Sequence, residues 1–147
     1  MVAPRYDRYD RYDRLDYTPL PKSVTLARHR AHRLLTEWGH PELADSAALL
    51  VSELGGNAVL HGCVPGRLFR VELALTEEGV LRISVSDPKG ESLPRPRGAA
   101  ADDVGGRGLL LVREFASRWG VCELTVGKSV WCELDVVRDA QGVPRTP

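Results

Sequence analysis

A carboxylate and an amide lie four residues apart in segment 52–62, whose sequence is SELGGNAVLHG. Residues four apart are neighbours on a helix, so Glu53 and Asn57 would lie side by side at the border of an apolar stripe. A carboxylate there can polarise a water or a hydroxyl, and an amide oxygen can complete the shell of Mg²⁺, which takes oxygen ligands. A hydrogen-bonded pair on a helix surface has the same spacing. The spacing alone therefore leaves a reactive pair and a surface pair both open.

Two further segments carry residue types that suit amino and phosphate groups. Asp87 follows an alternating pattern that starts at Leu81, where a carboxylate can accept a hydrogen bond from an amino group or form a turn with Pro88. The glycine-rich segment 105–108, GGRG, stands directly before a predicted helix, whose free N–H groups and dipole favour phosphate. Its spacing matches neither GxxxxGK[ST] nor GxGxxG.

Composition limits the classes of protein that this chain can be. Its 147 residues are 43% hydrophobic and 27% charged, which fits one compact domain. The 20 Lys and Arg balance the 20 Asp and Glu, so no excess of positive charge is available for nucleic acid or an anionic membrane. No apolar run approaches the ~18 residues of a membrane span, and segment 1–17 has no signal-like core. We expect a cytoplasmic protein with no direct contact to nucleic acid or membrane.

Two helices are predicted to position Glu53 and Asn57. The first runs over 23–39, with Ser23 as its cap and Gly39 at its end, because apolar residues recur at helical spacing. The second runs over about 41–60. Gly55 and Gly56 lie inside it, which predicts that something approaches the backbone closely there.

Strands and a third helix follow. Alternation predicts strands over 68–75 and 81–86, joined by a turn at 76–79, and then an irregular segment over 87–107. A helix from about 108 would bury Leu109, Val112, Ala116 and Trp119, and a hairpin over 121–126 and 129–137 would end the domain, with Gly127 and Lys128 in its turn. This order predicts an α+β fold, a two-layer sandwich with helices on one face of a mixed, mostly antiparallel sheet.

The two ends of the chain are expected to lie outside the domain. Residues 5–17 read RYDRYDRYDRLDY, and a period of three places no consistent stripe on a helix or a strand. We therefore predict a disordered tail over 1–18, with a contact arm for a partner as the alternative. The domain would cover 19–138, and a flexible tail would cover 139–147.

Taken together, these segments resemble the GHKL (Bergerat-type) ATP-binding domain that gyrase, Hsp90, histidine kinases and MutL share. Within it, they are most similar to the bacterial anti-sigma-factor serine/threonine kinases of actinobacterial type. SELGGNAVLHG resembles the N box, VSDPKGE the adenine-binding segment, GGRGLLLV the second glycine box, and GKSVWCEL the terminal hairpin. The resemblance covers about 19–137 and implies a histidine-kinase-like ATPase fold.

The resemblance also implies roles for individual residues and for partners. Glu53 would be the general base, Asn57 a ligand of Mg²⁺, and Asp87 the partner of the adenine amino group of ATP. The remaining nucleotide-binding residues would be Gly90, Gly105, Gly106, Arg107, Gly108 and Leu109. The protein would be a homodimeric kinase that phosphorylates an anti-sigma-factor antagonist and controls a sigma factor by partner switching.

Two departures from the family pattern keep a second interpretation open. The adenine segment of the family usually reads Asp-x-Gly-x-Gly, whereas this chain has Asp87 followed by Pro, Lys and Gly90. The kinases tend to carry a basic residue just before the second glycine box, where this chain has Asp102 and Asp103. The alternative is a catalytically degenerate, nucleotide-sensing module that still binds a protein partner.

Overall fold

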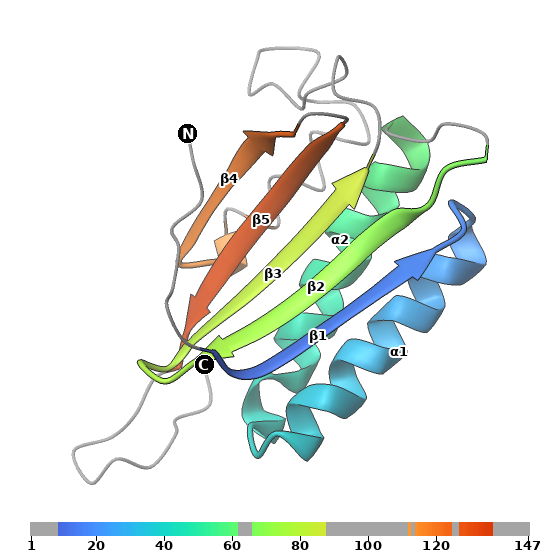
Figure 1. Ribbon diagram of the computed structural model, residues 1–147. Helices are drawn as coiled ribbons and strands as arrows, with labels where there is room; N and C mark the ends of the chain where they lie inside the picture. Colours follow the sequence, from blue (N-terminus) through green and yellow to red (C-terminus); the bar gives the residue numbers. More distant parts are fainter. Residues whose placement is uncertain (1–8, 62–65, 88–111, 113, 125–126, 137–147) are drawn as a thin grey trace, which may run out of the picture.

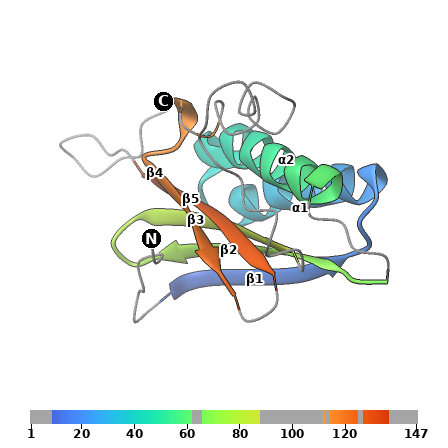
Figure 2. The same ribbon diagram turned by 90° about the horizontal axis from the view of Figure 1, so that it is seen from above.

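The described part of the chain folds into two layers, with two long helices on one face of a five-stranded sheet (Figures 1 and 2). The computed structural model describes residues 9–61, 66–87, 112, 114–124 and 127–136. The elements are β1 (Tyr9–Tyr17), α1 (Pro21–Glu37), a 3-10 turn (Pro41–Leu43), α2 (Ala44–His61), β2 (Phe69–Thr76), β3 (Val80–Asp87), β4 (Arg118–Glu123) and β5 (Lys128–Asp135). The strand order is β1-β2-β3-β5-β4, and all four pairings are antiparallel. The predicted α+β two-layer class is confirmed.

Helix α1 begins two residues earlier than its sequence indicates. Pro21 opens the helix, since a proline in the first turn loses no hydrogen bond, and the cap residue is Leu20. Ser23 is buried inside the first turn, so its predicted role as the cap is wrong. At the other end, Gly39 has a φ of +87°, the left-handed conformation that commonly follows a helix, as predicted.

Helix α2 is the central helix of the core. Its buried side chains lie between α1 and the sheet, and Gly55 is part of this contact: a Cβ there would lie 3.5 Å from a methyl of Val24. The predicted close approach is therefore confirmed at Gly55 but not at Gly56, where a Cβ would meet nothing within 4 Å. By length and composition, 41–61 is also the one segment among the described helices that could span a membrane. Half of that window is buried inside the domain.

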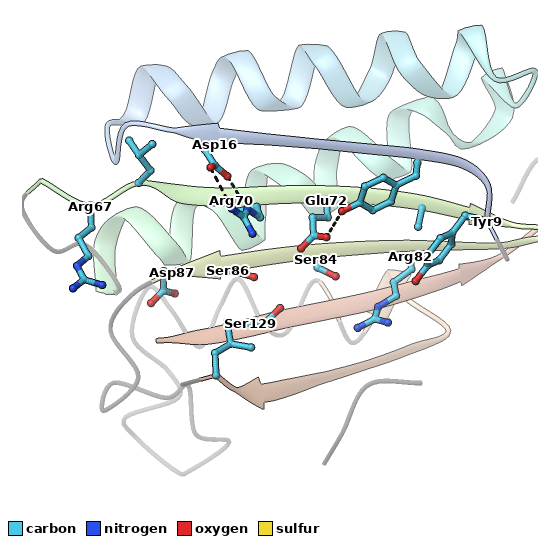
Figure 3. A pocket seen from close by; sticks show the side chains of 14 residues that line it. Tyr9, Asp16, Arg67, Arg70, Glu72, Arg82, Ser84, Ser86, Asp87 and Ser129 are labelled. Atoms are coloured by element: carbon cyan, nitrogen blue, oxygen red, sulfur yellow. Dashed lines mark hydrogen bonds and ion pairs between the residues drawn. The ribbon is translucent and has the colours of Figure 1, made fainter. Parts of the chain in front are cut away.

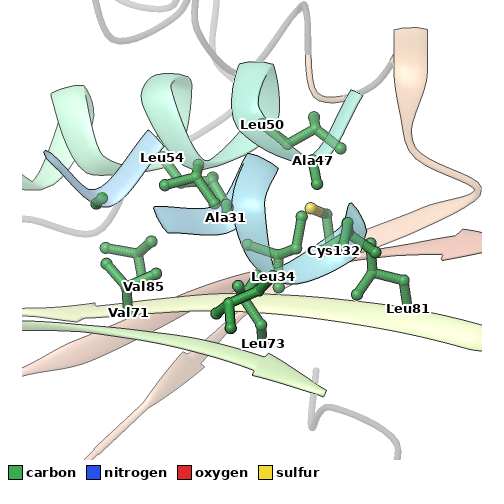
Figure 4. Packing of buried hydrophobic residues seen from close by; sticks show 14 of the residues in the cluster. Ala31, Leu34, Ala47, Leu50, Leu54, Val71, Leu73, Leu81, Val85 and Cys132 are labelled. Atoms are coloured by element: carbon green, nitrogen blue, oxygen red, sulfur yellow. The ribbon is translucent and has the colours of Figure 1, made fainter. Parts of the chain in front are cut away.

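Strands β2, β3 and β5 form the apolar surface on which the helices pack (Figure 4). One residue in two along β2, β3 and β5 faces the helices, because side chains alternate across a strand. These residues are Val71, Leu73 and Leu75 of β2, Leu81, Ile83 and Val85 of β3, and Val130, Cys132 and Leu134 of β5. Burial raises the pKa of the Cys132 thiol to about 12, which keeps it protonated and structural.

Strand β1 corrects the prediction of a disordered tail over 1–18 at its residues 9–17, whereas residues 1–8 lie outside the described residues. Tyr9–Tyr17 pairs with β2 along its whole length and forms an edge of the sheet. Its side chains are almost all exposed, so the apolar pattern that would reveal a strand is absent, and backbone pairing with β2 holds the segment instead. Only Tyr17 is buried, with its ring stacked on Phe69 at 5.6 Å.

The register of β1 against β2 shifts once. This shift reconciles the three-residue repeat of the sequence with the alternation of side chains along a strand, which has a period of two. Between Tyr9 and Arg11 the chain advances two residues while the partner strand advances one, as in a β-bulge. Without the shift, Tyr9 and Tyr12 would point to opposite faces. With it, their rings stack at 5.7 Å.

Polar contacts replace apolar burial along β1. Both oxygens of Asp13 accept hydrogen bonds from Arg30 of α1, at 2.9 and 2.7 Å. Asp16 accepts one from Arg70 of β2 at 2.8 Å. Tyr12 donates to Glu72 at 2.5 Å, and burial together with that carboxylate raises the pKa of Tyr12 to about 12. These contacts join β1 to both layers.

The C-terminal half differs from its prediction in two places. Within the helix predicted from about 108, Val112 is buried in the core as expected, but the helical residues end at Phe115. Trp119 lies in β4, so its place in the predicted helix stripe is wrong. Lys128, predicted in a turn, is the first residue of β5. The helix stripe and the following strand share apolar residues, which makes their boundary hard to read from periodicity.

The close packing of Gly120 against Trp131 predicts a size limit in β4. A Cβ at Gly120 would lie 2.8 Å from the Trp131 ring, and Arg82 stacks over the ring 5.5 Å from its centroid. Gly120→Ala should lower the free energy of unfolding by about 1–3 kcal/mol. Gly56→Ala, in open space on a helix, should raise it by about 0.5–1 kcal/mol. Urea denaturation measures both, and equal effects of the two variants would contradict the packing.

The Asp13–Arg30 ion pair predicts that β1 contributes to stability. Asp13→Ala removes a partly buried, two-point contact to α1 and should cost about 1 kcal/mol of unfolding free energy. Asp10 is the matched control: its carboxylate lies 3.7 Å from Arg11 and both side chains are more than half exposed. Asp10→Ala should change the unfolding free energy by less than about 0.5 kcal/mol. A loss at Asp10 as large as that at Asp13 would show that the repeat acts through charge in general.

Candidate functional site

Asp87 ends β3 on the face of the sheet that the helices cover. It is in phase with Leu81, Ile83 and Val85, so it continues the buried row of that strand. Its carboxylate is paired with Lys128, the residue directly opposite on β5, with Nζ 3.2 Å from Oδ1 and 3.1 Å from Oδ2. The two side chains are 3% and 5% exposed. The structure therefore places a buried carboxylate–ammonium pair where the sequence predicts a carboxylate alone.

Glu53 and Asn57 lie on α2 above the same end of the sheet. Gly55 of α2 approaches Phe69, the first residue of β2, and the next residue of β2, Arg70, pairs with Ser86, beside Asp87. Glu53 and Asn57 flank Gly55 in sequence but point to the opposite side of the helix, because two residues correspond to about 200° of rotation. They therefore face away from α1 and from the start of β2. Both are half-buried.

Burial changes the acidity of Glu53. Desolvation of its side chain raises the pKa of Glu53 above its ordinary value. A carboxylate with a raised pKa is a stronger base once ionised, and a cleft that desolvates it is a common setting for proton transfer. Of the two interpretations of the Glu53–Asn57 spacing, this burial favours the reactive one.

The described residues fit a magnesium ion held jointly with phosphates. They contain no group of three or more His, Cys, Asp or Glu side chains that could bind a metal alone. Mg²⁺ usually takes one or two protein oxygens and completes its shell with water and substrate phosphates. The amide oxygen of Asn57 suits such a role. Asp87, engaged by Lys128, is a less suitable ligand.

The remaining predicted site residues lie outside the described residues. They are Gly90, Gly105, Gly106, Arg107, Gly108 and Leu109. The predicted tail over 139–147 also lies outside them. Their roles stay predictions.

A cavity of about 540 Å³ lies on the other face of the sheet (Figure 3). Its lining includes Tyr12, Glu72, Arg82, Ser84 and Ser129, which alternate with the core residues and point away from the helices. Asp87 borders it at the end of β3. The cavity is therefore separated by the sheet from Glu53 and Asn57, and it is not the site that the sequence predicts.

Lys128 is the residue of this site that the sequence prediction missed. Its position directly after Gly127 predicts a turn. A signal was nevertheless present, because Lys128 is in phase with Val130, Cys132 and Leu134, the buried row of β5. Counting back by two from that row would have placed Lys128 inside, beside the end of β3.

Comparisons with known proteins find a similar solved structure and a matching family. The histidine kinase domain from Erythrobacter litoralis EL346 blue-light activated histidine kinase is similar in structure, with 19% sequence identity and a TM-score of 0.49. The similarity covers 76% of this chain and 60% of that one, so this chain spans about three fifths of that domain. No curated protein matches the chain. The family described as Histidine kinase-like ATPase domain matches residues 17–131, most of the chain. By this match, the chain belongs to the histidine kinase-like ATPase family.

Proposed function

We propose that this protein binds ATP with Mg²⁺ and acts as a serine/threonine kinase of the anti-sigma-factor type. The observation that carries the proposal is Glu53, a half-buried carboxylate with a raised pKa, one turn before Asn57 and above the end of β3. Family membership supports nucleotide binding in general. The burial of Glu53 is what favours chemistry over binding alone.

Each described residue has one task in this proposal. Asp87 accepts a hydrogen bond from the adenine amino group, and Asn57 holds Mg²⁺, which neutralises charge on the phosphates when bound. Glu53 takes the proton from a serine or threonine hydroxyl of the substrate protein as that oxygen bonds to the γ-phosphorus. The bond from the γ-phosphorus to the bridging oxygen breaks, and ADP carries that electron pair away. Positioning and charge compensation supply most of the rate in such transfers.

The partners follow from the same proposal. The hydroxyl would belong to an anti-sigma-factor antagonist, and the protein would hold a sigma factor whenever the antagonist is phosphorylated. We propose a cytoplasmic homodimer for this role. The resemblance of segments 52–62 and 105–112 to the anti-sigma-factor kinases supports these partners.

A nucleotide-sensing module without transfer activity is the second candidate. The observation in its favour is the sequence before the second glycine box, where Asp102 and Asp103 stand in place of a basic residue. A cation near the γ-phosphate is worth orders of magnitude in rate. In this candidate, ATP would still change the affinity for a protein partner, and Glu53 would have no proton to take.

Glu53→Gln separates the two candidates. The substitution keeps the size of the side chain and removes the basic oxygen, so ATP affinity should stay within about twofold while transfer falls by ~10²-fold or more. Transfer of phosphate to candidate antagonist proteins is followed by mass spectrometry, and ATP binding by calorimetry. Loss of ATP binding in this variant would make Glu53 a structural residue or a metal ligand. A wild-type protein that binds Mg-ATP and transfers nothing would establish the nucleotide-sensing module.

The raised pKa of Glu53 gives the same test a pH dependence. Because Glu53 works ionised, the transfer rate should fall as the pH drops through its raised pKa, and Glu53→Gln should lack this acid limb. The free energy of unfolding should change with pH in the opposite direction. A carboxyl group with a raised pKa stabilises the fold only while it is protonated. That contribution is lost as the pH rises through the pKa of the folded state. The variant should thus be at least as stable as wild type at neutral pH. A marked loss of stability there would contradict the assigned role.

The variant Asn57→Ala tests whether Asn57 is a ligand of Mg²⁺. Removing the amide oxygen should lower the affinity for ATP by about tenfold in the presence of Mg²⁺. The affinity in excess chelator should stay almost unchanged. Ser46→Ala is the matched control, since Ser46 is another half-buried polar residue of α2 and lies three turns earlier. Calorimetry under both conditions measures the effect. Equal losses with and without Mg²⁺ would show that Asn57 supports the helix or contacts the nucleotide itself.

A further inference from the structure

We propose that Lys128 recognises the adenine base together with Asp87, by donating a hydrogen bond to ring nitrogen N1. This inference rests on the proposed function, because it takes Asp87 as the residue that receives the adenine amino group. It adds a residue to the site and a reason for the choice of base. Three observations carry it: the geometry of the pair, the chemistry of its two ends and its burial.

Any ligand that binds the carboxylate of Asp87 also lies close to the ammonium group of Lys128. The two residues are directly opposite each other on β3 and β5, and their side chains leave the sheet on the same face. Nζ lies 3.1–3.2 Å from both oxygens of the carboxylate. A group that comes within hydrogen-bonding distance of the carboxylate therefore lies next to the ammonium as well.

The two ends of the pair match one edge of adenine. An ionised carboxylate only accepts hydrogen bonds, and an ammonium group only donates them. Adenine offers an amino donor at C6 and an acceptor at the adjacent N1. Guanine has the reverse order at these positions, an oxygen acceptor at C6 and a donor at N1. With the C6 group at Asp87 and N1 at Lys128, the pair fits adenine and opposes guanine.

Burial makes the two contacts depend on each other. Both side chains are at least 95% buried, and a buried charge that loses its partner is strongly destabilising. A base that only drew Asp87 away from Lys128 would remove this hydrogen-bonded ion pair. N1 of adenine provides an acceptor at that point, so the amino group can bind Asp87 while Lys128 remains hydrogen-bonded.

The test compares ATP with 1-deazaadenosine triphosphate, in which a carbon replaces N1 and the amino group remains. Wild-type protein should bind ATP about tenfold more tightly than the analogue in calorimetry, since a hydrogen bond from a charged donor is lost. Lys128→Met keeps the length of the side chain without the donor, and its preference should fall to about twofold or less. Lys22→Met, the same change at an exposed position of α1, should keep the full preference.

Each outcome decides the proposal. Equal binding of the two nucleotides by wild type overturns it, because no donor then reaches N1. A folded Lys128→Met protein that keeps the wild-type preference overturns it as well, since another group must be the donor. If wild type binds neither nucleotide, the proposed ATP site fails and this inference falls with it. Should Lys128→Met not fold, the double variant Asp87→Asn with Lys128→Met removes both buried charges, and a preference retained there would count against Lys128.

Discussion

Asp87 and Lys128 face each other because β3 and β5 pair without interruption over eight residues, from Val80–Asp135 to Asp87–Lys128. Three of these pairs bury apolar side chains under the helices, and the fourth pair on that face is the ion pair. A buried carboxylate at the end of a core strand needs a compensating charge, and the pairing of the strands supplies it at that position. A shift of one residue would turn Lys128 to the other face, leave Asp87 without this cation and expose the apolar row. The core and the candidate site therefore depend on the same alignment.

The orientation of α2 is marked by a different contact, the packing of Gly55 against α1 and the start of β2. The helix lies close enough to Val24 and Phe69 that a Cβ at this position would be in van der Waals contact with both. That contact faces α1 and β2, so Glu53 and Asn57 on the opposite side are turned away from both. Desolvation by burial raises the pKa of Glu53 on that side of the helix. A packing contact between two helices thus sets the orientation of residues that have no part in it.

The sequence predicts most of the helical layer and the central strands because their apolar residues repeat with clear periods. The sequence is a poorer guide to elements whose position is determined by backbone pairing or by a single charged residue. Strand β1 buries only Tyr17, so nothing in the hydropathy of Arg-Tyr-Asp repeats indicates a strand, and its pairing partner lies more than fifty residues away. The position of Lys128 after Gly127, between two predicted strands, predicts a turn, although Lys128 is in phase with the buried row of β5. In the candidate site, Glu53 and Asp87 could be chosen from their spacing and strand position, whereas the partner of Asp87 depended on how β3 and β5 align.

The pairing shift in β1 has a consequence for how the chain can change in length. Identical Arg-Tyr-Asp units cannot fix their own alignment against β2, since a slide by one unit brings the same residue types to the partner strand. The alignment is instead fixed at the end nearest α1, where Tyr17 stacks on Phe69, Asp16 binds Arg70 and Asp13 binds Arg30. With the strand anchored at this one end, units can be gained or lost at the other without moving the core. A change in the number of repeat units would therefore leave these three contacts as they are, whereas a substitution of Asp13, Asp16 or Tyr17 would remove one of them.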